Sequence, residues 1–366
     1  MKPRAIFHLD GETGLRGGER QLLYLAAALR ARGRRNVICA KSGGELEKEA
    51  LKQGFETRSS SWGLPLSARA EGAIIHAHTG HAAKIAAVAS WLGVPSVSHR
   101  RVDFGVKPLS ARFNYGSARK VVCVSKAIAD IMKSAGTPEN KVAVIPDGLP
   151  VTPEESKWAM IDPGRFAVPS PSERDSHRKA LAEEFNFPQD SILVGNLAAL
   201  VPHKDHDTLI AAAVIVLLQR PKTKFLIAGR GPEEEKLFES IKRMGLLGKV
   251  LLLGHRPDPI PLLKALDIYV QSSWGEGMGS VLIEAAACGV PVCATTAGGI
   301  PEVVEDGATG FLVQPRNPEA LAGVIMRMLD DANLRKNMAK ESRAGIGRFG
   351  LTRMANDMEK IYDSIS

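Results

Sequence analysis

The chain has few aromatic residues, few cysteines and no long apolar run, and each shortage excludes a class of protein. Aromatic residues make up only 5% of the 366 residues, which argues against a platform for stacking nucleobases and predicts no nucleic-acid partner. The four cysteines form no C-x-x-C pair, so we expect reduced, buried thiols rather than a disulfide framework. The longest apolar stretch, residues 209–218, is too short to span a membrane.

The start of the chain and its charge distribution suggest where the protein works. A short apolar run interrupted by His8 and Asp10 predicts a first strand rather than a signal peptide, and the reduced cysteines predict a cytoplasmic protein. Residues 1–150 contain 23 Lys and Arg against 12 Asp and Glu, whereas the remainder contains 25 against 28. The basic half suits an acidic substrate or the inner face of an anionic membrane, where each basic residue contributes about 1 kcal/mol. Ordinary solvated surface charge is the alternative.

Short apolar strands alternate with amphipathic helical stretches in both halves of the chain, which predicts an α/β fold with parallel sheets. The first half predicts strands at residues 5–9, 36–40, 73–77, 95–99 and 121–125, and a helix at residues 19–32. The second half predicts strands at residues 192–197, 224–228, 250–253, 268–271 and 292–294. The proline-rich residues 150–171 predict a linker between two tandem Rossmann-like domains, residues 1–169 and 170–347.

Two carboxylates eight residues apart, Glu276 and Glu284, flank a glycine-bracketed turn that leads into an apolar helix. Small residues let the backbone approach a ligand, and the free N–H groups at the start of a helix form an anion site. A carboxylate further along the helix can accept hydrogen bonds from ligand hydroxyls. A site that recognises both phosphate and polyol predicts a sugar nucleotide as the ligand.

Further short motifs follow one another along the chain. They are Gly17-Gly18-Glu19-Arg20, Val124-Ser125-Lys126-Ala127-Ile128, Val144-Ile145-Pro146-Asp147-Gly148, Pro202-His203-Lys204-Asp205-His206, Ala228-Gly229-Arg230-Gly231-Pro232, Gly298-Gly299-Ile300-Pro301-Glu302 and Gly307-Ala308-Thr309-Gly310. Together with the E-x7-E segment from Glu276 to Glu284, their order and spacing resemble the retaining glycosyltransferases of family 4. These enzymes have two Rossmann-like domains facing each other across a cleft, the GT-B fold, and the resemblance covers nearly the whole chain. It also implies that residues 348–366 pack back on the first domain.

The resemblance implies roles for the residues near the helix start. The counterpart of Glu284 holds the ribose hydroxyls of the donor, and that of Glu276 contacts the donor sugar at the reaction centre. The counterpart of Lys204 neutralises the diphosphate. The backbone N–H groups that would face the phosphate and sugar belong to Met278, Gly279, Ser280 and Val281.

One position departs from the family pattern. Most relatives carry an arginine five residues before the lysine, and here that place is taken by Ala199. The loss of one group that stabilises the transition state typically costs about 2.7–4 kcal/mol. Either His203, Arg230 or Arg16 supplies the missing cation, with Arg230 assigned to the donor site, or the protein is catalytically impaired.

The glycine-rich residues 11–18 lack both the G-x-G-x-x-G spacing of dinucleotide sites and the Gly-Lys-Ser/Thr of P-loops. We expect instead a phosphate-facing loop before the first helix. In that loop Gly17 and Gly18 would let the backbone approach the donor. A simple turn between strand and helix is the alternative.

Histidines gather near the ends of the early strands. The spacing of His76, His78 and His81 matches no closed zinc site, so we expect no metal. The resemblance places His99 near the donor sugar, and His78 is assigned to the acceptor side. Arg100 and Arg101 either bind an acidic acceptor or are structural.

These expectations combine into one function. The resemblance implies a metal-independent, retaining transfer of a hexosyl unit from a sugar nucleotide, expected to be a UDP-sugar, with no separate cofactor. The acceptor would be a glycan or a lipid-linked sugar of cell-surface polysaccharide or lipopolysaccharide synthesis, reached from the inner face of the membrane. The alternative is a catalytically impaired sugar-nucleotide-binding protein of a glycan-assembly complex.

Overall fold

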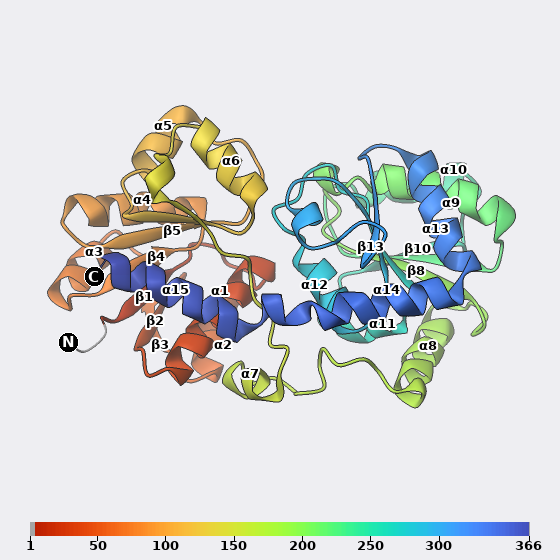
Figure 1. The fold of residues 1–366 in the computed structure, drawn as a ribbon, viewed down its shortest axis with the longest axis horizontal. Helices are drawn as coiled ribbons and strands as arrows, with labels where there is room; N and C mark the ends of the chain where they lie inside the picture. The colour runs from red at the N-terminus through yellow and green to blue at the C-terminus, as the bar shows by residue number, and fades with distance from the viewer. Residues whose placement is uncertain (1–3, 366) are drawn as a thin grey trace. The chain divides into compact units, whose positions relative to one another are not determined.

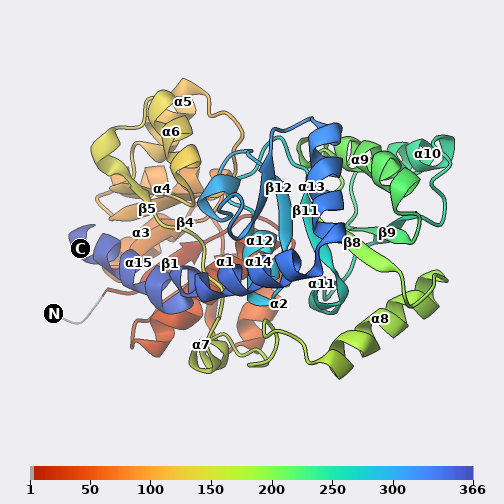
Figure 2. The same cartoon turned by 45° about the vertical axis from the view of Figure 1, so that its right-hand side comes forward.

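The computed structural model describes residues 4–365, and the chain divides into two compact units. One unit contains the residues up to Pro163 together with those from Gly347 onward, and the other contains Gly164–Ile346. Each unit is a parallel sheet with helices packed around it, as Figures 1 and 2 show. The division falls before the expected boundary at residue 169, because Gly164 and Arg165 already bind unit-two residues Lys264 and Asp258.

The sheet of the first unit has seven parallel strands in the order β3-β2-β1-β4-β5-β6-β7. The strands are β1 (Ile6–Leu9), β2 (Asn36–Ala40), β3 (Glu56–Ser59), β4 (Ile74–Ala77), β5 (Ser96–Arg100), β6 (Lys120–Cys123) and β7 (Val142–Val144). Strands β1, β2, β4 and β5 are buried along their whole length. This continuous burial is typical of parallel strands that are covered on both faces.

The helices of the first unit include the last helix of the chain. They are α1 (Gly17–Ala31), α2 (Glu45–Lys52), α3 (Leu64–Ala70), α4 (Gly80–Trp91), α5 (Pro108–Ser110), α6 (Lys126–Ser134), α7 (Pro153–Trp158) and α15 (Leu351–Ile365), with short turns η1 (Ala111–Tyr115) and η2 (Glu139–Lys141). The apolar face of α15, including Met354 and Tyr362, packs into a core cluster with Leu25 and Leu29 of α1. This packing explains why the final segment belongs to the first unit.

The sheet of the second unit has six parallel strands in the order β10-β9-β8-β11-β12-β13. The strands are β8 (Ile192–Leu197), β9 (Thr223–Ala228), β10 (Val250–Gly254), β11 (Ile268–Gln271), β12 (Val292–Thr295) and β13 (Gly310–Val313). The helices are α8 (Pro171–Phe185), α9 (His206–Gln219), α10 (Glu234–Arg243), α11 (Ile260–Ala265), α12 (Ser280–Ala287), α13 (Pro318–Asp330) and α14 (Ala332–Ala344), with turns η3 (Pro202–Lys204), η4 (Ile300–Glu302) and η5 (Ile346–Phe349), the last leading back to the first unit.

Both sheets reverse their strand order at one point, between β1 and β4 in the first unit and between β8 and β11 in the second. Ligands of open α/β sheets bind at such switch points, beyond the carboxyl ends of the strands. The predicted site residues cluster at these two points. Among residues 4–365, no helix is long and apolar enough to cross a membrane.

Candidate functional site

The site in the second unit centres on an ion pair at the β8/β11 switch point. Lys204 ends the short turn after β8, and Glu276 lies in the loop after β11. The Lys204 Nζ lies 2.5 Å from Glu276 Oε2, and both side chains are largely buried, with 17% and 12% of their surfaces exposed. The structure therefore joins two residues that are 72 positions apart in the sequence and that we singled out separately.

A chain of hydrogen bonds orients the Glu276 carboxylate. Gln271 at the end of β11 donates through Nε2 to Glu276 Oε2 over 2.8 Å, and the Tyr269 hydroxyl donates to Gln271 Oε1 over 2.5 Å. Burial, and then the charge of Glu276, raise the pKa of Tyr269 well above its ordinary value, so this hydroxyl keeps its proton. Neither Tyr269 nor Gln271 was predicted as a site residue, although both lie in the strand that leads to Glu276.

The backbone around Glu276 is held against a glycine pair. Gly299 donates its N–H to the Glu276 carbonyl over 3.1 Å, and a Cβ built on Gly298 would lie 1.9 Å from the same oxygen. Gly298 also has φ +49°, a conformation that residues with side chains rarely adopt. The Gly298-Gly299 motif thus allows its backbone to lie directly against the carbonyl of Glu276.

Gly298→Ala is therefore expected to displace the Glu276 loop and, in the transfer reaction that the sequence resemblance implies, to lower the turnover number by about 10²-fold, because a displacement of 1 Å at a reaction centre can cost that much. Gly307→Ala is a matched control, since Gly307 also has positive φ but nothing lies within 4 Å of its Cβ position. Steady-state kinetics of both variants, with circular dichroism to verify folding, would measure the difference. Equal activity in the two variants would contradict this role of Gly298.

Helix α12 begins directly after the glycine turn, as the sequence predicts. Gly279 precedes the helix with φ +83°, so the chain turns sharply from Met278 into Ser280. The first N–H groups of a helix have no partner within the helix, and they are available to an anion. Glu284 lies one turn into α12, and its charge also contributes to raising the pKa of Tyr269, which places both motif carboxylates near one buried phenol.

The loop that carries Lys204 is braced from behind. Asp205 adopts a left-handed conformation, φ +52°, and its carboxylate caps α9 by accepting the N–H of Thr208. His206 bonds through Nε2 to Asn196 Oδ1 over 3.1 Å, and Asn196 Nδ2 donates to the carbonyl of Val270. Burial lowers the pKa of His206 to about 4, so the ring is neutral and ties β8 to β11.

Arg230 lies beside the position where the family arginine is missing. Ala199, which follows β8, is exposed, and the residue after it, Leu200, donates its N–H to the carbonyl of Arg230 after β9. Arg230 is exposed, and its guanidinium has no hydrogen-bond or ion-pair partner within residues 4–365. Arg230 is therefore a candidate for the missing cation, because its backbone bonds directly to the loop that contains Ala199.

In the first unit, histidines and Arg101 form a network at the β1/β4 switch point. Arg101 NH1 lies 3.1 Å from His78 Nδ1, His78 Nε2 lies 3.1 Å from His8 Nδ1, and His8 Nε2 lies 2.9 Å from Asn36 Oδ1. Because arginine only donates, His78 must accept at Nδ1 and carry its proton on Nε2. His8 then carries its proton on Nε2 and donates to Asn36.

His99 joins this network through the same arginine. Arg101 NH2 donates to His99 Nδ1 over 3.3 Å, so the proton of the neutral His99 ring is on Nε2. That Nε2 is buried and has no hydrogen-bond partner within the described residues. Burial chiefly, and then Arg101, lower the pKa of His99 well below its ordinary value.

The histidine cluster raises the question of a metal. One nitrogen from each of His8, His76 and His78 lies within 4.8 Å of the others. This group differs from the one considered from the sequence, which was His76, His78 and His81. His81 lies in α4 and is exposed. The nitrogens of His8 and His78 already bond to each other, and the neighbouring Arg101 cation disfavours a second positive charge. The expectation of no metal stays a prediction.

The two arginines predicted for the acceptor have internal partners. Arg100 donates to the Tyr115 hydroxyl over 3.1 Å and to the Phe104 carbonyl over 2.5 Å. Arg101 forms a buried ion pair with Asp147, with Nε 2.9 Å from Oδ1, in addition to its two histidines. These contacts favour the structural alternative for Arg100, whereas Arg101 lies beside His78 and His99.

Asp10 is a buried carboxylate at the same switch point that the sequence analysis did not assign to the site. It follows β1 directly at the switch point and is 1% exposed. Burial raises the pKa of its carboxyl to about 6, which is unusual for a structural aspartate and common at functional sites. Its position as the first residue after the first strand is the signal that identifies it.

The glycine pair near the N-terminus is not in the loop as expected. Gly17 and Gly18 form the first two positions of α1, with Arg16 as the residue before the helix. The Glu19 carboxylate accepts the N–H of Arg16 over 2.8 Å, which stabilises an early helix start. Any phosphate contact of Gly17 and Gly18 would therefore come from first-turn N–H groups rather than from a flexible loop.

Comparisons with known proteins agree with this geometry. A family model described as "Glycosyl transferases group 1" matches residues 177–345, and one described as "Glycosyltransferase Family 4" matches residues 15–152. The chain belongs to the group 1 glycosyltransferases of family 4. The Family 4 model falls within the first structural unit, and the group 1 model falls within the second.

Solved structures show that the family fold extends over the whole chain. HepE from Anabaena, in complex with UDP, has a TM-score of 0.85 at 24% identity and covers 98% of this chain and 100% of its own. A glycosyltransferase from Rickettsia africae has a TM-score of 0.82 at 20% identity and covers 100% and 99%. The fold is therefore GT-B.

Curated relatives share part of the sequence. N-acetyl-alpha-D-glucosaminyl L-malate synthase of Bacillus anthracis is 32% identical over 154 residues, 42% of this chain and 40% of the relative. D-inositol 3-phosphate glycosyltransferase of Streptomyces coelicolor is 27% identical over 258 residues, 67% of this chain and 55% of the relative. The chain spans about half the length of these curated relatives.

The buried histidines predict how the stability of this family member depends on pH. Burial lowers the pKa of His8 to about 4, and it holds the pKa values of His76, His78 and His99 well below 6.5. The unfolded chain therefore binds more protons below pH 6.5, and each histidine costs about 1.4 kcal/mol of folding stability per pH unit. Asp10, with its raised pKa, acts in the opposite direction below pH 6, but it is one group against these four histidines and His206, whose pKa burial also lowers to about 4.

We therefore expect the free energy of unfolding, measured by urea titration, to fall steeply between pH 7 and pH 5. His8→Asn should reduce the slope, whereas His177→Asn, which changes a partly exposed surface histidine, should leave it unchanged. A free energy of unfolding that stays constant over this range would show that the cluster is not held neutral.

Proposed function

We propose that the protein is a retaining glycosyltransferase that transfers a hexosyl unit from a UDP-sugar. The observation that carries the proposal is the buried Lys204–Glu276 pair at the β8/β11 switch point, followed directly by the start of α12. One cation, a helix N-terminus and a carboxylate one turn further along match the diphosphate and ribose of a sugar nucleotide. HepE from Anabaena forms crystalline complexes with UDP and with UDP-glucose, which supports uridine as the base.

In this proposal Lys204 and the first N–H groups of α12 stabilise the departing diphosphate, and no metal is required. Glu284 accepts hydrogen bonds from the ribose hydroxyls. Glu276 contacts the donor sugar and, in the free protein, holds Lys204 in place. The bond between C1 of the sugar and the diphosphate oxygen breaks, and the acceptor oxygen bonds to C1 on the same face. The acceptor's proton passes to the leaving phosphate oxygen.

His99 is assigned to a donor-sugar hydroxyl or to a carbonyl near the reaction centre. Its Nε2–H is the group that remains available, because Arg101 occupies Nδ1. Asp147 holds Arg101 through an ion pair, so the orientation of His99 depends on both residues. His99→Ala should lower the turnover number with little change in UDP affinity; unchanged turnover would remove His99 from the mechanism.

The first unit supports the proposal of an acceptor at a membrane surface. Four exposed apolar side chains lie within twelve residues of one another, and basic side chains accompany them. The apolar members are Val102, Phe104, Leu109 and Phe113, and the basic ones are Lys107 and Arg112. Exposed apolar side chains next to cations suit the interface of an anionic bilayer. Co-sedimentation with phosphatidylglycerol vesicles should be lost in Leu109→Asp/Phe113→Asp; unchanged binding would exclude this surface.

Thermal-shift titration with UDP, GDP and ADP tests the donor assignment. A ligand at 100 times its dissociation constant stabilises the folded state by about 2.7 kcal/mol, so only the correct base should raise the melting temperature strongly at low concentration. Incubation with UDP-glucose and other UDP-hexoses, followed by detection of released UDP, then identifies the sugar. The absence of stabilisation by any nucleoside diphosphate would exclude the proposed function.

A catalytically impaired binder is the second candidate, and the exposed Ala199 favours it. Ala199→Arg is expected to raise the turnover number by about 10²–10³ if the missing cation limits the reaction, because one transition-state donor is worth that much. If Arg230 already supplies the charge, Ala199→Arg changes little and Arg230→Gln causes a loss instead. Ordinary turnover by the unmodified protein would eliminate the impaired candidate.

A further inference from the structure

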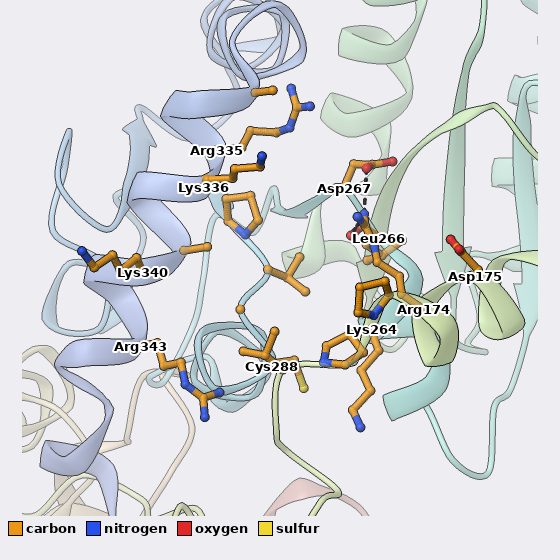
Figure 3. Close-up of a pocket in the computed structure, with 18 residues that line it drawn as sticks. Arg174, Asp175, Lys264, Leu266, Asp267, Cys288, Arg335, Lys336, Lys340 and Arg343 are labelled. Atoms are coloured by element: carbon orange, nitrogen blue, oxygen red, sulfur yellow. Dashed lines mark hydrogen bonds and ion pairs between the residues drawn. The ribbon is translucent and has the colours of Figure 1, made fainter.

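A pocket lies in the C-terminal unit, at the end of the sheet opposite the candidate donor site. It has a volume of about 610 Å³ and is drawn in Figure 3. Leu266 and Asp267 in its wall directly precede β11, whereas Glu276 follows β11. Because the strands are parallel, the pocket is at their amino ends, and a ligand there would not overlap the donor.

The pocket combines an apolar floor with a basic rim. The apolar lining comes from Val168, Pro169, Leu266, Cys288, Val290 and Pro291. The α14 side of the rim contributes the labelled cations of Figure 3, which are Arg335, Lys336, Lys340 and Arg343. The opposite side is formed by α8 and α11, with Arg174 and Lys264.

The charges on the two sides of the pocket differ in their partners. On the far side, Asp267 neutralises Arg174 over 2.7 Å, and Glu173 neutralises Lys264 over 2.8 Å. On α14, Lys336 and Lys340 have no hydrogen-bond or ion-pair partner anywhere in residues 4–365. The uncompensated positive charge therefore lies on α14, where Figure 3 shows the Lys340 side chain turned away from the pocket, so that its flexible stem must rotate to reach a ligand there.

We propose that this pocket binds an amphipathic phosphate, with the phosphate on Lys336 and Lys340 and an apolar body on the floor. Lysines act as point charges and suit a phosphate group without demanding a fixed geometry. The volume falls within the range of about 300–1,000 Å³ that is typical of small-molecule sites. This site is additional to the proposed glycosyl transfer and does not depend on it.

A ligand in this pocket would contact residues next to both of the segments that connect the two units. Val168 and Pro169 follow the first passage of the chain between units, which occurs after Pro163, and α14 ends just before the second passage, after Ile346. Arg343 in the rim also donates to the Ala287 carbonyl at the end of α12, the helix that begins at the donor site. Occupancy of the pocket is therefore positioned to affect the donor site through α12.

Isothermal titration of the full chain with octyl phosphate tests the proposal, with inorganic phosphate and octanol as references. We expect octyl phosphate to bind at least about tenfold more tightly than either reference, because only it uses both the floor and the rim. Dihexanoyl phosphatidic acid, which is soluble and carries a lipid headgroup, tests whether the natural ligand is a lipid or a soluble phosphate ester. If it displaces octyl phosphate, a lipid is the natural ligand, and if it does not, a soluble phosphate ester is.

Two variants distinguish binding in this pocket from non-specific electrostatic attraction. Lys336→Gln/Lys340→Gln should weaken octyl phosphate by about tenfold or more. Ala339 is a small residue of α14 that also lines the pocket, so Ala339→Trp should block the floor. The matched control is Lys242→Gln, which removes the charge of an exposed lysine on α10, outside the pocket. Unchanged circular dichroism spectra and melting temperatures of these variants would show that they remain folded. Failure of octyl phosphate to bind, or equal binding by the double variant and Lys242→Gln, would overturn the proposal.

Discussion

Replacement of Lys204 by methionine is expected to lower the turnover number by about 10²–10³, the usual cost of removing one group that stabilises a transition-state charge. Lys204 lies in the loop after β8 with its ammonium on the Glu276 carboxylate and with 17% of its side chain exposed. A donor diphosphate would take over this ammonium. Because the charge on the diphosphate increases as the bond to the sugar breaks, the loss should affect turnover more than the KM for the donor.

The variant also leaves Glu276 buried without its cation, so part of its effect is structural. Lys236→Met is the matched control, because Lys236 pairs with Asp207 at 2.6 Å but is 57% exposed. We expect Lys236→Met to retain full activity and Lys204→Met to keep the circular dichroism spectrum of the unmodified protein. Full turnover by a folded Lys204→Met variant would show that the diphosphate is stabilised elsewhere.

Removal of the Glu284 carboxylate is expected to weaken UDP by roughly 10- to 150-fold, since each hydrogen bond to a charged group contributes about 1.5–3 kcal/mol. Glu284 lies one turn into α12, beyond the glycine turn, where a ribose would reach it if the diphosphate occupies the helix start. Calorimetric titration of Glu284→Ala with UDP measures the loss. Glu239→Ala, which changes an exposed acid on α10, serves as the control.

A second comparison tests whether Glu284 contacts the ribose. The unmodified protein should bind 2′-deoxy-UDP more weakly than UDP, whereas Glu284→Ala should bind the two nucleotides equally. This double comparison isolates the contact between the carboxylate and the hydroxyl from any general loss of affinity. If Glu284→Ala still discriminates fully between the two nucleotides, the ribose is held by another residue.

The strands that the sequence predicts are those with continuous apolar runs, and all of them except the edge strand β10 occupy the interiors of the sheets. Strands β3, β7 and β13, which were not predicted, are edge strands. Strand β3 reads Glu56-Thr57-Arg58-Ser59 and is largely exposed, so no apolar run identifies it. Strand β13 is buried, but its first residue, Gly310, was assigned to a turn motif. An edge strand has one neighbour, and its sequence is correspondingly less constrained.

The two parts of the candidate site differ in the same way. Lys204 and Glu276 lie in local motifs, so each was predicted separately, and only their direct contact is new. The network of the first unit joins His8, Asn36, His78 and Arg101 from four separate segments. That contact requires the strand order β2-β1-β4-β5, which reading the chain in sequence does not provide. The pocket beside α14 likewise depends on how α8, α11 and α14 assemble.

A crystal structure of the full chain soaked with UDP is the most direct test of the central claim. We predict that the diphosphate lies against the backbone N–H groups of Ser280 and Val281 and near Lys204, with the ribose hydroxyls bonded to Glu284. Electron density for UDP at any other position, or a complete failure of UDP to bind while the protein is folded, would contradict the account.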